Sequence, residues 1–360
     1  MSRLTNKLSH NLLKFQQNKS SVVSSYSALS CFNLLWQGLS GDSLNEVNKS
    51  FGIDNKDAPK YYSELYNLHK TLQKESSLKV CNFVLTKNTL QLQQPYVSSI
   101  AQLGNHEYFS DDEINHLVPK VNILVKHNTN GLIDDLLSPE DIKDDTIFVL
   151  LNTIYFKSDW NSKFDANDTN GGKFVGLLGD RKEMFMHLTD GRLKYHDGKT
   201  FQMLEMPYKN SNFTFGVILQ KDKKATPLLM DELTLEQHIK LLQYEFVNVT
   251  FPKFTQETEL DMIPFFKQIG INKIFDDMDP YNMIQYSASA GKYFISVIKQ
   301  KVKLIVDENG TEASAATVIV GCEESCMETP ETIEFVADHP FSYYIRYVPT
   351  NTLLFSGMFV

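Results

Sequence analysis

The residues whose types and spacing most suggest chemistry lie in one segment, from Gly310 to about Ile333. This segment runs roughly twenty residues between two strong strand patterns, which is long for a connection inside a compact domain. Within it, Glu323-Glu324-Ser325 stands between Cys322 and Cys326. The two cysteines could form a redox-sensitive pair. A loop of this length is usually functional or disordered, so a disordered surface loop is the alternative interpretation.

The stretch that leads into this loop, Asp307 to Thr317, combines a strand's period with residues that sheets normally avoid. Gly and Ala are poor strand formers because they lose backbone entropy and offer little side chain to pack. The alternation nevertheless continues from the strand pattern at Phe294–Val306. Since Glu312 must face water, the opposite face holds only slim, uncharged residues: Thr311, Ala313, Ala315 and Thr317. Such a segment could enter a sheet that is already formed.

The common motifs of enzymes are absent from the chain. It has no G-x-S-x-G, no Walker loop, no G-x-G-x-x-G, no H-E-x-x-H and no C-x-x-C. The nine histidines are dispersed, and no two have the i, i+4 spacing of a helical metal pair. A catalytic Cys–His pair could be assembled by the fold, but nothing marks one. His339 is better explained as part of the turn into Pro340-Phe341. We therefore expect no catalytic residue, no metal site and no cofactor.

Composition favours one globular domain over residues 1–360. With 42% hydrophobic and 12% aromatic residues the chain can bury a substantial core, and no linker, repeat or low-complexity stretch divides it. A formal charge of −9 argues against nucleic-acid and anionic-membrane partners. The N-terminus is polar and lacks the apolar core of a secretory signal, so a cytoplasmic location is expected. Cys31 and Cys81 lie in apolar runs and are predicted to be buried thiols.

Helical patterns come first along the chain and strand patterns follow, which is typical of an α+β fold with large sheets. Helices are expected at 27–39, after Asp42, at 61–72, 96–103 and 120–136, and a strand with a hairpin at 78–90. Further strands are expected at 146–156, 203–206, 213–219, 246–251, 294–306, 341–347 and 352–359. Asp42 could cap the second helix.

Several segments resemble signatures of the serpin family, in the family's order. They are the hinge Asp307–Thr317, the helix Asn122–Ile133, the strand Asn152–Trp160 followed by Phe164-Asp165, then Phe251-Pro252-Lys253-Phe254, Ile269-Gly270-Ile271 with Phe275, Ala337–Phe341 and Leu354–Gly357. The chain resembles a serpin from about Ser20 to its last residue. The Asp338-His339-Pro340-Phe341 motif, the short N-terminus and the missing signal segment are most similar to intracellular poxviral serpins of the cytokine-response-modifier type.

The resemblance implies the serpin fold, in which helices pack on three β-sheets and a reactive-centre loop, here about residues 308–333, is exposed. It also implies a suicide-substrate mechanism. A protease attacks a bond at the loop's tip and forms an acyl-enzyme, after which the hinge inserts as a new central strand. About fourteen residues at 3.3 Å each give about 45 Å of strand, which drags the tethered protease across the molecule. The implied partner is a protease, bound covalently to a serpin monomer.

The resemblance assigns further residues. The hinge would comprise Glu308, Gly310, Thr311, Glu312, Ala313, Ser314, Ala315, Ala316 and Thr317, and the sheet-opening region would contain Ser24, Ser27, Asn152, Trp160 and Gln300. The chain also departs from the family. Ser24-Ser25-Tyr26-Ser27 lacks the usual proline, Gln300 replaces the usual histidine, and the chain stops at Val360, before the common C-terminal proline. Gln can replace one histidine hydrogen bond but cannot titrate, so tuning of sheet opening is expected to differ.

Three bonds are candidates for the one that the protease attacks. The family's usual spacing, counted from Glu308, places it between Glu324 and Ser325. A loop one residue shorter, as in some poxviral serpins, gives Glu323-Glu324, and Cys326-Met327 is the third choice. The first two put an acidic residue before the bond, which suits a protease pocket with a basic floor, as in caspases and the aspartate-preferring granule serine protease.

Three classes of function follow from these observations. The first is a cytoplasmic inhibitor of an acid-preferring serine or cysteine protease, in the host cytoplasm if the chain is viral, where it would block cell death or inflammation. The second is a non-inhibitory binding or decoy protein with the same fold. The third, a hydrolytic enzyme, has no motif behind it. The small residues of the hinge favour the first class.

Overall fold

The computed structural model describes residues 1–110, 112–284, 292–311 and 332–360. It divides into two compact units. The first unit contains Met1, residues 26–155 and residues 258–303, and the second contains residues 2–25, 156–257 and 304–360. The expectation of one domain over 1–360 stays a prediction. None of the helices in the described part of the chain has the length and apolar character needed to span a lipid bilayer.

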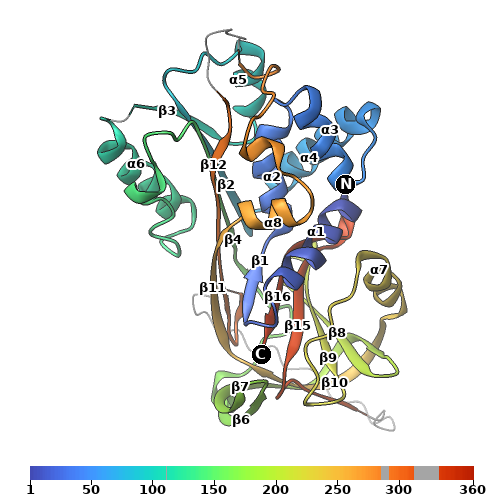
Figure 1. Cartoon of the computed structure of the whole chain (residues 1–360). Coiled ribbons are helices and arrows are strands. Elements are labelled where there is room, and N and C mark those ends of the chain that lie inside the picture. Colours follow the sequence, from blue (N-terminus) through green and yellow to red (C-terminus); the bar gives the residue numbers. More distant parts are fainter. Residues whose placement is uncertain (111, 285–291, 312–331) are drawn as a thin grey trace. The chain divides into compact units, whose positions relative to one another are not determined.

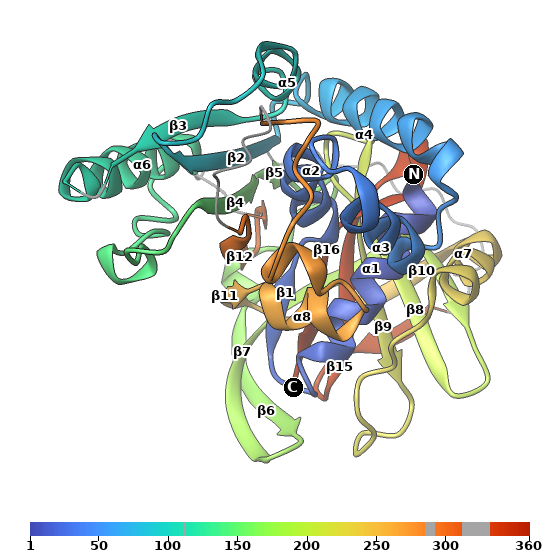
Figure 2. The same ribbon diagram turned by 45° about the horizontal axis from the view of Figure 1, so that its top comes forward.

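The helices of the first unit are built around buried aromatic residues. They are α2 (Ser25–Trp36), α3 (Gly41–Phe51), α4 (Ala58–Leu72), α5 (Gln94–Ile100), α6 (Ile114–Asn128) and α8 (Ile263–Gln268). Figure 2 shows α2, α3 and α4 side by side. Trp36 packs edge-on against Phe51 and Tyr62, with ring centroids 5.1 and 4.7 Å apart. Such pairs add to the stabilisation that burial provides.

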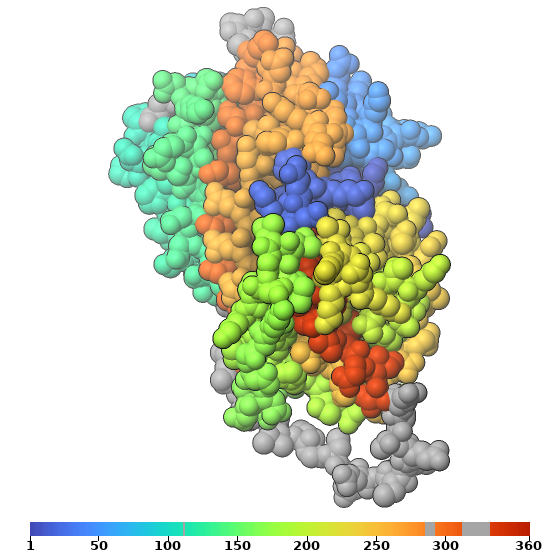
Figure 3. All heavy atoms as spheres, turned by 60° about the horizontal axis from the view of Figure 1, so that its bottom comes forward, coloured from blue at the N-terminus to red at the C-terminus, as the bar shows by residue number. Residues whose placement is uncertain are grey.

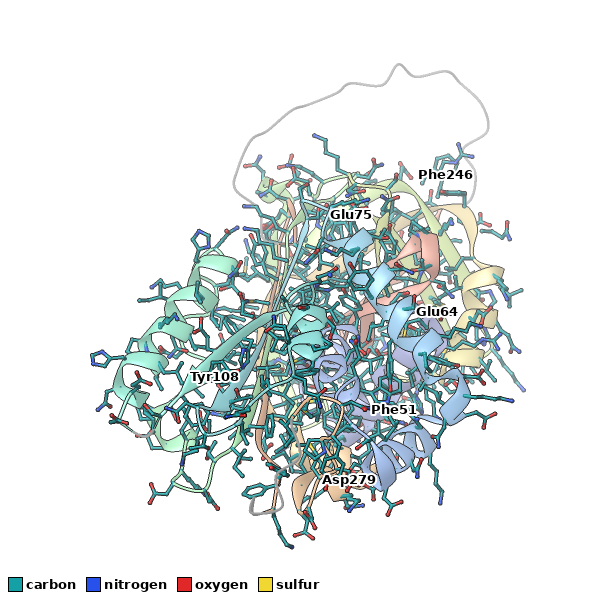
Figure 4. All side chains as sticks on the ribbon, turned by 90° about the horizontal axis from the view of Figure 1, so that it is seen from above. Phe51, Glu64, Glu75, Tyr108, Phe246 and Asp279 are labelled. Atoms are coloured by element: carbon teal, nitrogen blue, oxygen red, sulfur yellow. The ribbon has the colours of Figure 1, made fainter. Side chains whose placement is uncertain are left out.

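The start of α3 differs from the prediction that Asp42 caps it. The helix begins one residue earlier, at Gly41, and its N-cap Ser40 makes no side-chain cap. The Asp279 carboxylate, labelled in Figure 4, accepts hydrogen bonds from the Ser43 backbone N–H at 3.0 Å and from the Ser43 hydroxyl at 3.1 Å. A carboxylate from a distant segment therefore does what a local cap does elsewhere.

One sheet of seven strands has the order β3-β2-β4-β12-β13-β5, with β11 paired to β12. Its strands are β2 (Leu78–Lys87), β3 (Asn105–Phe109), β4 (Phe148–Phe156), β5 (Ser158–Asp159), β11 (Phe254–Asp261), β12 (Ile295–Val306) and β13 (Gly310–Thr311). In the first unit β4 and β12 pair directly and in parallel, from Ile295↔Phe148 to Val302↔Ile154. All nine residues of β4 are buried, including the polar Asn152 and Thr153.

The other sheet, of nine strands, lies in the second unit. Its strands are β1 (Ser21–Val23), β6 (Asn170–Gly176), β7 (Gly179–Asp197), β8 (Phe201–Pro207), β9 (Phe213–Gln220), β10 (Gln243–Pro252), β14 (Ile333–Val336), β15 (Phe341–Tyr347) and β16 (Thr352–Phe359). The long strand β7 pairs with β6 through residues 179–185, with β10 through residues 185–195 and with β8 through residues 194–197. The described strands therefore pair into two sheets, whereas three were expected.

Two helices of the second unit pack beside each other. Figure 3 shows α1 (Ser2–Phe15, dark blue) against the yellow segment that carries α7 (Glu232–Leu241). Leu235 of α7 packs with Phe201 and Met203 of β8 in one apolar cluster. Short 3₁₀ helices in the described residues lie at Asn55–Asp57, Pro139–Asp141, Ala166–Asp168, Lys273–Phe275 and Val348–Thr350.

The predicted α+β class is confirmed, and two further local predictions are wrong. The strand at 78–90 forms no hairpin, because β2 pairs in parallel with β3 through the crossover helix α5. The helix at 120–136 begins earlier and ends at Asn128, because Asn130 and Gly131 adopt positive φ angles of 50° and 80°. Figure 1 shows α6 beside β2 and β3, where it covers an apolar cluster that includes Phe83, Leu85 and Val121.

Candidate functional site

The predicted hinge begins inside the seven-stranded sheet. Gly310 and Thr311 form β13, which pairs antiparallel with the end of β12 through Val306↔Thr311. On its other edge β13 pairs with β5 through Gly310↔Asp159 and Thr311↔Ser158. Thr311 is only 1% exposed. The start of the predicted hinge is therefore already a short strand.

Gly310 is required by the closeness of β5. A Cβ at this position would lie 2.2 Å from the carbonyl oxygen of Ser158 and 2.7 Å from the Cα of Asp159. Both are backbone atoms, so they cannot move aside as a flexible side chain could. Any other residue would push β13 out of its place between β12 and β5.

The turn that leads from β12 into β13 is closed by Asp307. Its carboxylate accepts hydrogen bonds from the N–H groups of Asn309 at 2.9 Å and Gly310 at 3.2 Å, and its own N–H donates to the Gly310 carbonyl at 2.9 Å. This is the local behaviour expected of aspartate at a turn.

Trp160 holds the same turn from the side of β5. Its indole Nε1–H donates to the Asp307 carbonyl and its backbone N–H to the Asn309 carbonyl, both at 2.8 Å. The indole stacks on Tyr208, with centroids 4.6 Å apart and planes 9° apart. The Tyr208 phenol in turn lies 2.6 Å from the Thr311 hydroxyl, so one buried chain of contacts joins the turn to β13.

Glu308 is nearly buried and ion-paired. Its carboxylate accepts from Lys253 Nζ at 2.8 Å and from the Thr169 hydroxyl at 2.9 Å. Burial opposes ionisation of Glu308, but the hydrogen bonds from Lys253 and Thr169 and the Lys253 charge outweigh it and hold the pKa of Glu308 below its ordinary value. The loop's first residues are therefore tied to the nine-stranded sheet.

The far end of the loop is also tied to β7 and β10. Asn248 donates to the Glu334 carboxylate at 2.7 Å, and the Thr332 hydroxyl donates to Asp190 at 3.1 Å. Strand β14 then pairs in parallel with β10 from Val247↔Ile333 onward. Glu312, Ala313, Ser314, Ala315, Ala316 and Thr317, the candidate bonds at Glu323, Glu324, Ser325 and Cys326, and Cys322 lie outside the described residues.

The residues predicted for sheet opening separate into three sets of contacts. Asn152 joins two of the others: its Nδ2 donates to Ser27 Oγ at 2.6 Å, and its Oδ1 accepts from Gln300 Nε2 at 2.8 Å. Gln300 therefore joins the Asn152 cluster through its side-chain amide, and its replacement of a histidine hydrogen bond stays a prediction. Trp160 belongs to the hinge turn instead, and Ser24 donates to the carbonyl of Leu354 on β16.

Sequence reasoning missed several partners. Asn82 accepts from Asn152 Nδ2 at 2.7 Å. Tyr208 and Thr169 carried no sequence signal, whereas Lys253 lay within a matched motif but without a role. Cys31 and Cys81 are buried as predicted, and burial raises the pKa of both thiols. His339 is also buried, bonded to Asp338 and to the Gln220 carbonyl, in the predicted turn.

The comparisons with known proteins agree with the fold. The profile of the family "Serpin (serine protease inhibitor)" matches residues 1–360, so the chain belongs to the serpin family. An "Uncharacterized serpin-like protein R700" of Acanthamoeba polyphaga mimivirus is 28% identical over 310 residues, which cover 83% of this chain and 75% of that protein. The finer likeness to poxviral serpins stays a prediction.

Two solved structures illustrate the shared fold. Native protease nexin-1 with heparin has a TM-score of 0.84 at 22% identity and is covered to 98%, with 99% of this chain aligned. Thyroxine-binding globulin in complex with thyroxine has a TM-score of 0.83 at 22% identity, with 99% of this chain and 96% of that chain covered. At these identities the likeness shows the fold alone, and the serpin fold prediction is confirmed.

Proposed function

We propose that this chain inhibits a protease as a suicide substrate, through insertion of the loop after Thr311 into the seven-stranded sheet. The observation that carries the proposal is the position of Thr311, which is buried and hydrogen-bonded as the last residue of the short strand β13, between β12 and β5. The small residues at 313–317 can extend that strand without burying a charge.

Direct pairing of β4 with β12 supports an uninserted starting state. A new strand that continues from β13 would separate these two strands and gain hydrogen bonds along both of its edges. The sheet is therefore expected to be more stable with the loop inserted than without it. This difference would supply the free energy that drags an acyl-linked protease and distorts its active site.

The proposed target is an acid-preferring serine or cysteine protease of the granzyme or caspase type. This protease would attack the Glu324-Ser325 or the Glu323-Glu324 bond of the loop. A basic floor in the protease pocket would pair with the glutamate. Glu is one methylene longer than Asp, so a tight aspartate pocket would bind it less well. The mimivirus relative and the Asp338–Phe341 motif support a viral protein that limits host apoptosis or inflammation from the host cytoplasm, as a monomer.

The deciding experiment mixes the protein with a panel of caspases and granule serine proteases and examines the products on denaturing gels. We expect an SDS-stable complex and a released C-terminal peptide whose mass identifies the cleaved bond. A panel that produces cleaved protein without any covalent complex would refute the inhibitory mechanism.

A second candidate is a non-inhibitory binding protein. The observation that favours it is the fold shared with thyroxine-binding globulin, whose structure was solved with thyroxine. Loop cleavage without stabilisation and without a covalent complex would favour this candidate, because a binding protein does not need loop insertion.

A further inference from the structure

Two histidines from segments far apart in the sequence face each other in the second unit. His196 Nε2, on β7, lies 3.2 Å from His238 Nδ1, on α7. The ring centroids are 5.2 Å apart and the ring planes differ by 34°. Both side chains are partly buried. The pair is separated by 42 positions along the chain, so no sequence spacing could have indicated it.

Apolar packing holds both rings in place. The Phe201 ring meets His238 edge-on at 4.9 Å and 90°, and it meets His196 at 6.0 Å. His196 is in register with Met203 of β8, which belongs to the apolar cluster beneath α7. At the start of α7 the Asp231 carboxylate caps the N–H groups of Leu233 and Thr234. The Asp231 cap and the contact of His238 with Phe201 therefore hold α7 in place without a ligand.

Two neutral imidazoles at this distance can do one of two things. One ring can donate a hydrogen bond to the other, or both can direct a lone pair at a shared ion. Zinc binds histidine nitrogen at about 2.0–2.1 Å in tetrahedral geometry, which sets two ligand nitrogens about 3.3 Å apart. The observed separation of 3.2 Å is close to that value.

We propose that His196 and His238 form a two-imidazole site for a divalent first-row transition metal, with copper, nickel and zinc as the candidates that imidazole prefers. The metal would bind His196 Nε2 and His238 Nδ1, leaving the protons on His196 Nδ1 and His238 Nε2. Both rings stay neutral, so binding needs only a change of tautomer in the ring that donated the hydrogen bond. The ion would fasten α7 to β7.

Neighbouring side chains in the described part of the chain add no third ligand to the two histidines. Asp197 is occupied by Lys221, with Nζ–O 2.8 Å. The described residues hold no cluster of three or more His, Cys, Asp or Glu side chains suited to a metal. Water would complete the coordination, and affinity would be lower than that of a four-ligand structural site.

The test uses the full-length protein, stripped of metal, in a buffer that does not bind metals at pH 7.5. We expect one equivalent of Cu²⁺ to bind with an EPR spectrum that shows two nitrogen ligands, and Ni²⁺ or Zn²⁺ to raise the melting temperature. His238→Gln and His196→Gln should each weaken binding by about tenfold or more. His187→Gln is the matched control, because His187 is another partly buried histidine of β7 but bonds Thr250 instead.

The outcomes separate the proposal from a simple hydrogen-bonded pair. If the wild-type protein binds no copper, or binds it without two nitrogen ligands, the proposal is refuted without any variant having to fold. Equal binding by wild type and His238→Gln would also refute it. A loss of binding that is as large in His187→Gln as in His238→Gln would place the ion elsewhere and overturn the assignment.

Discussion

The Thr311 hydroxyl lies 2.6 Å from the Tyr208 phenol, and both side chains are buried. This contact places the first inward-facing residue of the predicted hinge inside the sheet before any bond of the loop is cut. Insertion would then extend an existing strand, which avoids the cost of ordering a first pair of residues from a free loop. It also makes Thr311 the position where a substitution should act most directly on insertion.

We expect Thr311→Arg to be cleaved by the target protease but no longer to trap it. The arginine would need a buried place between β12 and β5, where an unpaired charge costs several kcal/mol, so β13 would be displaced and insertion could not continue from it. Gel assays of complex formation measure the effect. The matched control is Glu312→Arg, because the alternation of the hinge places Glu312 on the water-facing side. Undiminished complex formation by Thr311→Arg would exclude insertion from this position.

Cleavage of the loop should stabilise the protein. A non-target protease that cuts once between residues 312 and 331 frees the hinge to enter between β12 and β4, which adds a strand and its hydrogen bonds. We expect a marked rise in melting temperature, with mass spectrometry confirming the single cut. An unchanged melting curve after a clean cut would contradict a strained native state and support the non-inhibitory alternative.

The two glutamates of the loop should not be equivalent. If the protease pocket reads one carboxylate, only one of Glu324→Ala and Glu323→Ala abolishes trapping, and the other changes the rate modestly. Replacing the critical glutamate with aspartate should speed the reaction with a caspase-type target, by about 1–3 kcal/mol for one methylene in a tight site. Mass spectrometry of the released peptide assigns the bond. A new N-terminus at Met327, or at any residue not preceded by Glu, would refute the proposal that a glutamate precedes the cleaved bond.

Glu308 should stabilise the base of the loop in a way that depends on pH. Its pKa is lowered in the folded protein, so its contribution is present above the ordinary glutamate pKa of about 4.3 and is lost as pH falls through the folded value. We expect a coupling free energy of about 1 kcal/mol between Glu308→Gln and Lys253→Met, because the Lys253 side chain is 46% exposed and screened by water. A double-mutant cycle on the free energy of unfolding measures this coupling. Additive effects of the two substitutions would show that the Glu308–Lys253 ion pair does not stabilise the protein.

The parts of the fold that sequence predicted best are those where the pattern is local. The strands Phe341–Tyr347 and Thr352–Phe359 match the predicted bounds, because each is an apolar run limited by Pro340 or by the turn at 348–351. Strand β7 was missed because its many charged residues hide the alternation of apolar residues that indicates a strand. Hydrogen bonds to strands on both edges stabilise β7, although many of its side chains are exposed.

In the candidate site, too, the residues of one local segment were predicted and their distant partners were not. Glu308, Gly310 and Thr311 were assigned to the hinge by the family resemblance, which rests on a local run of residues. Their partners could not be predicted, since Tyr208 lies 103 positions from Thr311 and Lys253 lies 55 positions from Glu308. Such contacts are set by which strands become neighbours, and no single segment carries that information.

His69 should make the stability of the first unit depend on pH. Its ring is 1% exposed, and burial, with a smaller effect of Lys70, lowers its pKa to about 4. Gln73 Nε2 lies 2.9 Å from His69 Nε2, and the Tyr26 hydroxyl lies 3.2 Å from Nδ1. With Gln73 as donor, His69 Nε2 must be unprotonated, and a second proton there would set two N–H groups against each other.

The sign of the effect follows from the lowered pKa of His69. The unfolded chain takes up the proton near pH 6.5 and the folded protein only near pH 4, so stability falls as pH drops through this window, by at most about 3 kcal/mol. We expect denaturant unfolding, followed by the fluorescence of Trp36 in the first unit, to show this slope in wild type. His69→Gln should flatten it, whereas His116→Gln, at an exposed histidine, should leave it unchanged. An equal slope in wild type and His69→Gln would mean that another group carries the pH dependence.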